Sequence, residues 1–368
     1  MSSPATESSP PSVLGFNPTD WEKWLAQHGE KPYRAKQVLE WIFQKRVSSF
    51  ADMTNLSEGL RQRLQTEFSI DALTCVRVEG SIDTTRKFLF RLHDGRLVET
   101  VMIPASRDPY AEKQSDRITL CVSSQVGCAY DCKFCASGLA GFTRNLTAAE
   151  IVGQVLLAEK KTGNRVRNIV FMGMGEPLAN FRQLIRSIEI LNAHWGVNIG
   201  ARYITVSTSG LAPQIKKLAE FPLQIRLAVS LHGATDAVRQ PIMPVNRKYP
   251  LAELFQALEV WRDLKKQKIT FEYILIEGVN AGLDQAEILA KRCRAMKAKV
   301  NLIPYNTVEG LPWTRPSVPV QEAFLDVLKS QSVPATLRRE KGHDINAACG
   351  QLRLRVEEQM SSGPNPGP

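Results

Sequence analysis

The chain has 368 residues, of which 43% are hydrophobic and 23% are charged, and these values are typical of a globular protein with one large domain and an accessory part. No stretch reaches the roughly 18 consecutive apolar residues of a membrane-spanning helix. The N-terminus has neither the basic nor the apolar region of a secretory signal. The seven cysteines are clustered in a way that excludes a secreted disulfide framework. We therefore expect a cytoplasmic protein.

The chain is strongly basic. Lysine and arginine outnumber aspartate and glutamate by 47 to 37, which gives a net charge of +10 and a pI of about 9.3. An excess of this size favours a polyanionic partner, and nucleic acid is the usual one.

Residues 1–17 are rich in serine and proline, and we predict that they are disordered. Residues 18–103 are predicted to form an accessory region that is helical at first. Apolar residues recur at helical spacing after Pro32 and again from Leu56 to Leu64. Two helices are therefore expected here.

The period then changes to that of strands. Phe88, Phe90 and Leu92 recur at every second position before the turn Asp94-Gly95, and residues 98–101 follow. This pattern predicts a β-hairpin that joins the helical part to the rest of the chain.

Strands and helices alternate through residues 104–355, which we expect to form the main domain, followed by a disordered tail over 356–368. The strand-like runs are 118–123, 167–172, 203–207, 225–231, 270–276 and 299–304. The amphipathic stretches are 147–161, 180–193, 212–220, 250–266, 284–298 and 320–331. Six such units predict an α/β fold with a parallel sheet, either a partial (β/α)6 barrel or a flat doubly wound sheet. In both folds, ligands bind at the carboxyl ends of the strands.

Three cysteines lie in one short loop directly after the first predicted strand of the main domain. Cys128, Cys132 and Cys135 form a Cys-x3-Cys-x2-Cys pattern. Three thiolates suit an iron–sulfur cluster, in which one iron of four would keep an open coordination position. Half of a structural zinc site is the alternative. The spacing resembles the signature of radical S-adenosylmethionine enzymes.

Polar and small residues follow several of the other predicted strands. They are Gly175 and Glu176, Ser207, Ser230 with Leu231 and His232, and Asn306. The glycines near residue 175 would let the backbone approach a ligand closely. Each polar residue alone is typical of a turn or cap, and His232 alone indicates a structural hydrogen bond. Together, these side chains at successive strand tips predict a binding pocket.

Several blocks of the sequence resemble the dual-specificity RNA adenine C2-methyltransferase family, which belongs to the radical S-adenosylmethionine enzymes. The blocks are Val98–Val101, Leu120–Cys128, Gly173–Pro177, Ser207–Gly210, Ser230–His232 and Ala347–Leu352. They follow one another in family order from about residue 18 to residue 355. The resemblance implies a radical S-adenosylmethionine barrel with a small N-terminal helical domain and a short β-hairpin extension.

The resemblance also implies which residues bind the cofactors. Cys128, Cys132 and Cys135 would hold one [4Fe–4S] cluster, whose open iron would bind S-adenosylmethionine. The residues expected to contact the rest of that molecule are Gly175, Glu176, Ser207, Ser230, Leu231, His232 and Asn306.

The implied reaction uses two molecules of S-adenosylmethionine in each turnover. Cys349 would be methylated first, and a 5′-deoxyadenosyl radical would then take hydrogen from that methyl group. The carbon radical would add to C2 of adenine, which is too electron-poor to attack a sulfonium methyl. Glu99 would remove the C2 proton. Cys121 would attack sulfur, form a disulfide with Cys349 and release the product.

The substrates implied are an adenosine of 23S ribosomal RNA and the adenosine 3′ of the anticodon in transfer RNAs. A target base has to leave its stack to reach the mouth of a barrel. A basic loop with Arg338, Arg339 and Lys341, together with the N-terminal region, is our hypothesis for the RNA contacts. An external electron donor such as flavodoxin and a monomeric state are also expected.

Two other functions remain open at this point. The first is the sister activity, methylation of adenine C8 in ribosomal RNA, which confers antibiotic resistance and uses the same cysteines. The second is a zinc-containing RNA-binding protein without catalytic activity.

Overall fold

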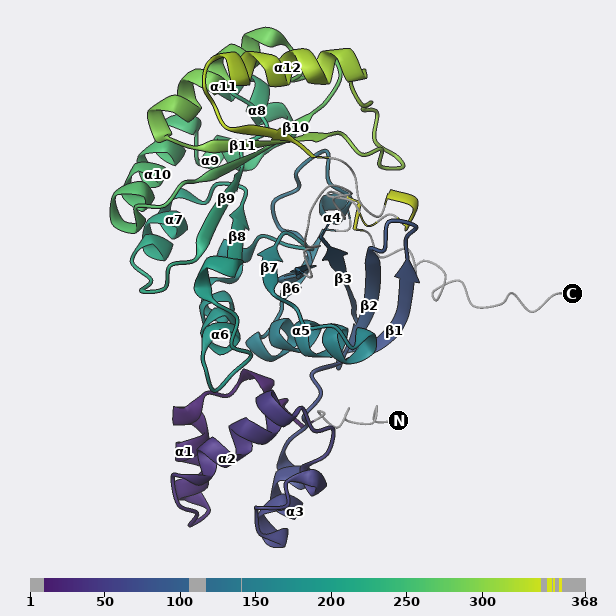
Figure 1. Cartoon of the computed structure of the whole chain (residues 1–368), viewed down its shortest axis with the longest axis vertical. Coiled ribbons are helices and arrows are strands. Elements are labelled where there is room, and N and C mark those ends of the chain that lie inside the picture. The colour runs from purple at the N-terminus through teal and green to yellow at the C-terminus, as the bar shows by residue number, and fades with distance from the viewer. Residues whose placement is uncertain are drawn as a thin grey trace, which may run out of the picture.

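The computed structural model describes residues 10–105, 117–139, 141–338, 343–345, 347 and 351–352. These residues form a ten-stranded sheet, a separate two-stranded hairpin and flanking helices (Figure 1). No helix in this part of the chain is both long and apolar enough to cross a membrane.

The N-terminal helices form a small domain at one end of the molecule (Figure 1). They are α1 (Pro18–Gln27), α2 (Arg34–Leu39), which continues as a π-helical turn over Glu40–Lys45, and α3 (Glu58–Glu67). The two helices expected from apolar spacing are therefore confirmed. Asn17 starts α1 with a capping box to Asp20, which satisfies two backbone amides of its first turn.

The folded chain begins earlier than the expected boundary at residue 18. Residues Val13–Gly15 form a short 3-10 helix, and the side chains of Val13 and Leu14 are buried. Ser12 also forms a β-bridge with Ser69. The expectation of disorder up to residue 17 was wrong for these residues, because two apolar side chains suffice to anchor a segment whose composition is otherwise polar.

Three antiparallel strands follow, namely β1 (Leu73–Gly80), β2 (Arg86–Leu92) and β3 (Leu97–Pro104). The predicted hairpin is confirmed as β2 and β3, and its turn places Gly95 at a φ of +81°. Strand β1 carries a β-bulge between Cys75 and Arg77. We call β1 to β3 the antiparallel extension.

Strand β3 pairs with β4, and from there every strand pair is parallel, in the order β4-β7-β8-β9-β10-β11-β12. The parallel strands are β4 (Ile118–Cys121), β7 (Asn168–Phe171), β8 (Ile204–Thr208), β9 (Arg226–Ser230), β10 (Thr270–Leu275), β11 (Lys299–Pro304) and β12 (Ala335–Leu337). The six predicted strands are all confirmed. The seventh, β12, was missed because three residues are too few to show a period.

The outer helices are α5 (Ala148–Thr162), α6 (Phe181–Asn192), α7 (Ala212–Ala219), α10 (Leu251–Lys265), α11 (Leu283–Met296) and α12 (Val318–Ser330). Two short helices, α8 (Asp236–Ile242) and α9 (Val245–Lys248), lie between β9 and α10. Helix α5 packs on α6, α7 on α10 and α11 on α12, so the helices follow one another along one side of a curved sheet (Figure 1). This arrangement is the partial barrel and not the flat sheet, which would carry helices on both faces.

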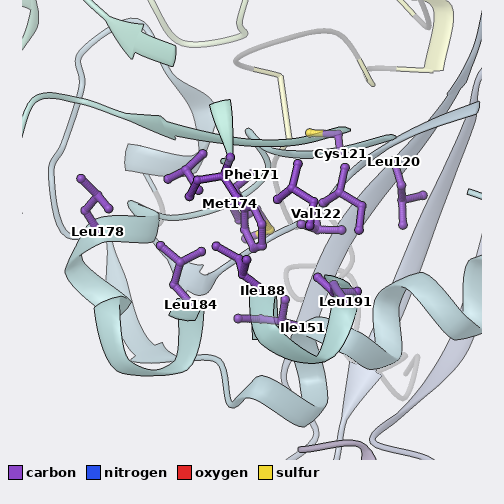
Figure 2. Close-up of a cluster of buried hydrophobic side chains, with 14 of the residues drawn as sticks. Leu120, Cys121, Val122, Ile151, Phe171, Met174, Leu178, Leu184, Ile188 and Leu191 are labelled. Atoms are coloured by element: carbon purple, nitrogen blue, oxygen red, sulfur yellow. The ribbon is translucent and has the colours of Figure 1, made fainter. Parts of the chain in front are cut away.

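The first barrel units are held together by a dry layer between sheet and helices (Figure 2). Ile151 of α5 and Ile188 of α6 are fully buried and lie under Leu120 and Phe171 of the sheet. Burying each such side chain contributes about 2 kcal/mol. This layer fixes the carboxyl ends of β4 and β7, which carry the functional loops.

Candidate active site

The cysteine loop leaves the sheet after β4 and is closed at its base by a small hairpin. Strand β5 (Gln125–Gly127) pairs with β6 (Phe142–Asn145), and the Cys128 amide donates to the carbonyl of Gly141 at 2.9 Å. Gly127 has a φ of +73°, and a Cβ there would overlap the Gly141 carbonyl. A glycine is therefore required where the two ends of the loop meet. The sequence analysis did not anticipate this hairpin.

The thiols of Cys128, Cys132 and Cys135 line one cavity at the carboxyl ends of the parallel strands. Burial raises the pKa of all three, and for Cys128 to about 12, with the neighbouring thiolate of Cys135 and the carboxylate of Glu176 adding to the effect. Burial of this kind disfavours thiolates unless a positive group balances them. A metal centre is such a group, because coordinating thiols deprotonate.

The donor set fits an iron–sulfur cluster. A four-iron cluster binds each thiolate at a different iron, so that its ligands surround a volume and do not meet at a point. Three thiols around a shared cavity meet that requirement.

The loop after β7 carries Gly173, Gly175 and Glu176. A Cβ on Gly175, whose φ is +95°, would lie 2.5 Å from the Cβ of Gln125, and one on Gly173 would lie 2.7 Å from the hydroxyl of Ser123. These glycines are needed in any case because this loop packs against the segment that follows β4. Both also line the cavity, so the expected close approach to a ligand stays a prediction.

Glu176 is buried with its carboxylate in a defined position. One oxygen accepts from the Leu178 amide at 3.0 Å and the other from the Ser209 amide at 2.7 Å. Burial raises the pKa of Glu176, while these amide donors counteract the rise. Since each carboxylate oxygen has a second lone pair, Glu176 can still accept a proton donor from the cavity that it lines.

His232 lines the cavity as a neutral ring. Its backbone is left-handed, with a φ of +55°, and its Nδ1 accepts from the Ile274 amide at 3.0 Å. Burial and the charge of Arg239 lower its pKa to about 3. With Nδ1 accepting, the ring proton is on Nε2, so His232 can donate a hydrogen bond but cannot serve as a base near neutral pH.

Arg239 on α8 organises the strand tips, and the sequence analysis missed it. Its guanidinium is fully buried and donates to the carbonyl oxygens of Leu231, Ser209 and Ser230 and to the side chain of Asn246. It thereby joins the end of β8 to the end of β9. Burial lowers its pKa to about 10, which leaves it charged at neutral pH.

The remaining residues predicted to bind the cofactor divide into two groups. Ser207 and Ser230 line the same cavity as the three cysteines. Leu231 and Asn306 are buried close by but are not among the described residues that line it. Leu231 donates its amide to Glu272, and Asn306 accepts from Arg315.

Glu99 and Cys121 lie on the sheet and are not among the described residues that line the cavity. Glu99 is in β3 and Cys121 in β4, and the pairing of Val101 with Cys121 places both side chains on one face. The Ser123 hydroxyl donates to the Glu99 carbonyl at 2.6 Å and accepts from the Met174 amide at 2.9 Å. The sulfur of Cys121 points away from the dry layer around Ile151 (Figure 2).

Cys349, Arg339 and Lys341 lie outside the described residues. The described positions on either side of Cys349 are anchored. Leu352 is buried and its carbonyl accepts from the hydroxyl of Ser137, two residues after Cys135, at 2.9 Å. Asp344 accepts from the hydroxyl of Ser81 and, at 3.2 Å, from the Ile82 amide. Asp344 and Leu352 are thus anchored at the β1–β2 turn and just after the cysteine loop, respectively.

Comparison with known proteins shows the family to which the chain belongs. Residues 12–70 match the ribosomal RNA large subunit methyltransferase N-terminal domain, and residues 122–286 match the radical SAM superfamily. The probable dual-specificity RNA methyltransferase RlmN of Akkermansia muciniphila is 56% identical over 92% of this chain and 94% of its own length. The corresponding protein of Bacillus subtilis is 45% identical over 95% of this chain and 94% of its own. A radical SAM methyltransferase from Sphaerobacter thermophilus has a TM-score of 0.87 and 43% identity, covering 94% of this chain and 99% of that one.

Fold, cysteine loop and matches together define a radical S-adenosylmethionine methyltransferase. A [4Fe–4S] cluster and S-adenosylmethionine are the cofactors of this class. The chain belongs to the dual-specificity RNA methyltransferase family, with relatives 44–56% identical over most of its length.

Proposed function

We propose that this protein methylates C2 of an adenosine in 23S ribosomal RNA and C2 of the adenosine 3′ of the anticodon in transfer RNAs. The observation that carries the proposal is the shared cavity of three thiols and five of the predicted strand-tip residues in a chain so similar to dual-specificity RNA methyltransferases. The net charge of +10 also favours an RNA substrate.

In this proposal the cavity binds both cofactors. Cys128, Cys132 and Cys135 hold the cluster, and Glu176 accepts from the cationic amino group of S-adenosylmethionine. His232 donates its Nε2 proton, and the hydroxyls of Ser207 and Ser230 supply further hydrogen bonds. Gly175, Leu231 and Asn306 complete the proposed contacts. When bound, the cofactors supply a methyl group and a 5′-deoxyadenosyl radical.

The remaining steps are proposed for residues of the chain itself. Cys349 carries the methyl group on its sulfur and becomes joined through that carbon to C2 of the base. Glu99 accepts the C2 proton, and the unpaired electron left on the adduct by radical addition passes to an external one-electron acceptor. The Cys121 thiolate then attacks the sulfur of Cys349, so that a disulfide forms. The bonding pair of the carbon–sulfur bond passes to the methylene carbon, which takes up a proton and stays on the base as a methyl group.

Further parts of the proposal concern the protein in the cell. We propose two molecules of S-adenosylmethionine for each turnover, an external electron donor such as flavodoxin, a monomeric state and a cytoplasmic location. Residues 18–103 and the basic loop at Arg338 are the proposed RNA-binding parts. Residues 104–355 form the proposed catalytic domain.

The test is an anaerobic assay of the reconstituted full-length protein with ribosomal RNA fragments and transfer RNA, followed by nucleoside analysis. 2-Methyladenosine in both RNAs is the expected product. 8-Methyladenosine would replace the proposal by the resistance-type activity. A colourless protein that contains zinc and never cleaves S-adenosylmethionine would indicate an RNA-binding protein without catalysis.

A further inference from the structure

Three charged side chains lie side by side across the antiparallel extension. The ammonium group of Lys87 on β2 lies 3.0 Å from a carboxylate oxygen of Glu79 on β1 and 3.3 Å from one of Glu99 on β3. We call Glu79, Lys87 and Glu99 the charge ladder. It connects the proposed base of the reaction to the outer strand of the sheet.

The register explains why these side chains meet. Glu79 is directly opposite Lys87, and Lys87 is opposite Val101, so Glu99 is its diagonal neighbour on the same face. Cys121 is the next residue in the row formed by Glu79, Lys87 and Val101. This face is opposite to the one that carries Thr100, which bonds Gln154 of α5.

Burial increases along the charge ladder from the edge inward. The exposed fraction of the side chain falls from 27% at Glu79 to 11% at Lys87 and 5% at Glu99. A lysine this deeply buried beside a buried carboxylate is uncommon unless the two are paired. The burial of Lys87 beside Glu99 therefore reflects either a role in the chemistry of Glu99 or a purely structural ion pair.

We propose that Lys87 is a positioning residue that keeps Glu99 ionised and aimed, so that Glu99 can accept the proton from the substrate base. This inference rests on the proposed function, which assigns Glu99 as that base.

The physical reason is the effect of burial on a carboxyl group. Withdrawal from water favours the neutral acid, which cannot accept a proton, whereas an ammonium group within about 4 Å favours the carboxylate. Lys87 supplies that charge at 3.3 Å. Its contact with Glu79 limits the effect, since one ammonium group is shared between two carboxylates.

Two further titratable side chains lie near the charge ladder in the described part of the chain. Arg77 contacts the second oxygen of Glu79 at 3.0 Å and has a half-exposed side chain. Cys121 is the titratable neighbour of Glu99 across β4. The backbone of Glu99 is held by Ser123, so replacing Lys87 removes the charge without removing that anchor.

The experiment measures release of RNA from the protein in a single turnover. Full-length protein with its cluster, methylated at Cys349, is mixed anaerobically with an RNA fragment, S-adenosylmethionine and reductant, and is quenched in denaturant. The ratio of covalent adduct to free methylated RNA is followed between pH 5.5 and 9. Cleavage of S-adenosylmethionine is measured in the same samples.

For Lys87→Met we expect the acidic limb of the release rate to move up by about one pH unit or more, because Glu99 then ionises only at higher pH. Release near neutral pH should slow about tenfold while cleavage of S-adenosylmethionine is unchanged. Lys87→Arg should restore the profile. Glu79→Gln should move the limb the other way, to lower pH, since Lys87 then pairs with Glu99 alone.

The matched control is Arg91→Gln, which removes an exposed positive charge from β2 away from the charge ladder and should leave the profile unchanged. Superimposable profiles for wild type, Lys87→Met and Glu79→Gln would overturn the inference. If Lys87→Met does not fold, the test rests on Glu79→Gln, whose acidic limb of the release rate should move to lower pH. Absence of any adduct with the wild-type protein would refute the proposed function, and this inference with it.

Discussion

In the parallel half of the sheet, from β4 to β12, the three cysteines and several other side chains at the cavity lie in the loops that follow the strands, whereas in the antiparallel extension the charged side chains lie within the strands. Cys128, Glu176 and His232 all follow a strand end. Glu99 lies within β3 and Lys87 within β2. The two regions therefore position chemistry by different means.

The difference has a physical origin. A loop can place backbone amides, thiols and a left-handed residue such as His232 around a cofactor, because it is not tied to a ladder of hydrogen bonds. A strand fixes the direction and spacing of its side chains, which suits an ion pair whose geometry must not change. Loop residues thus supply most of the proposed cofactor contacts, with Ser207 and Ser230 added from the ends of β8 and β9, and a strand residue supplies the proposed proton acceptor.

In the parallel half, the largest effect is expected from replacing a cysteine that is proposed to bind the cluster. Cys132→Ala should abolish cluster retention and cleavage of S-adenosylmethionine, because two thiolates no longer fix the cluster with one open iron. Iron and sulfide analysis after anaerobic reconstitution is the measurement. Cys293→Ala, in the buried face of α11, is the matched control and should keep its iron. Retention of a full cluster by Cys132→Ala would contradict the assignment.

The corresponding change in the extension should act later in the reaction. Glu99→Gln keeps the shape of the side chain but cannot accept a proton, so product release should fall by about 10²- to 10⁴-fold. Cleavage of S-adenosylmethionine should continue, with RNA accumulating on the protein in denaturing gels. Glu259→Gln, an exposed position on α10, serves as the control. A free methylated product at the wild-type rate would remove Glu99 from the mechanism.

Replacing Arg239 tests how strongly the ends of β8 and β9 depend on its hydrogen bonds. Arg239→Met leaves several buried carbonyl oxygens without their donor, and we expect a loss of about 3 kcal/mol in the free energy of unfolding. Affinity for S-adenosylmethionine should fall as well. Urea denaturation and equilibrium binding measure both effects, with the exposed Arg247→Met on α9 as the control. Equal stability of the two variants would show that other contacts hold β8 and β9 together.

His232 gives the smallest expected effect, and one that depends on pH. The pKa of about 3 in the folded chain lies below the unfolded value of 6.5, so the unfolded state binds a proton first as the pH falls. Stability attributable to His232 is complete above pH 6.5 and is lost below it, by about 2 kcal/mol at pH 5. His232→Asn should remove this loss, since asparagine tolerates the left-handed backbone and can still accept from Ile274. Thermal unfolding at pH 5 and pH 7.5 would check it, and an unchanged acid loss in the variant would contradict it.

The sequence predicted the site best where candidate functional residues directly follow a predicted strand. Cysteine spacing and the residues after each strand predicted a site at the carboxyl ends, and the cavity contains Cys128, Glu176 and His232 together. The barrel strands were predictable because each shows a run of apolar residues long enough to have a period.

What could not be predicted depends on contacts between distant segments. Lys87 is one lysine among many in the sequence, and only the register of three strands places it between two carboxylates. Arg239 likewise gave no signal, because an arginine on a short helix is usually exposed. The packing role of Gly175 required knowing that its loop lies against Gln125.

The bulge in β1 has a consequence for association between molecules. In the described sheet β1 is an outer strand, and Val76 and Val78 on it are more than 40% exposed. Such an edge could template pairing with another chain, but the irregularity between Cys75 and Arg77 interrupts its row of free amides and carbonyls. The same defect that disturbs the ladder thus protects the protein against edge-to-edge polymerisation.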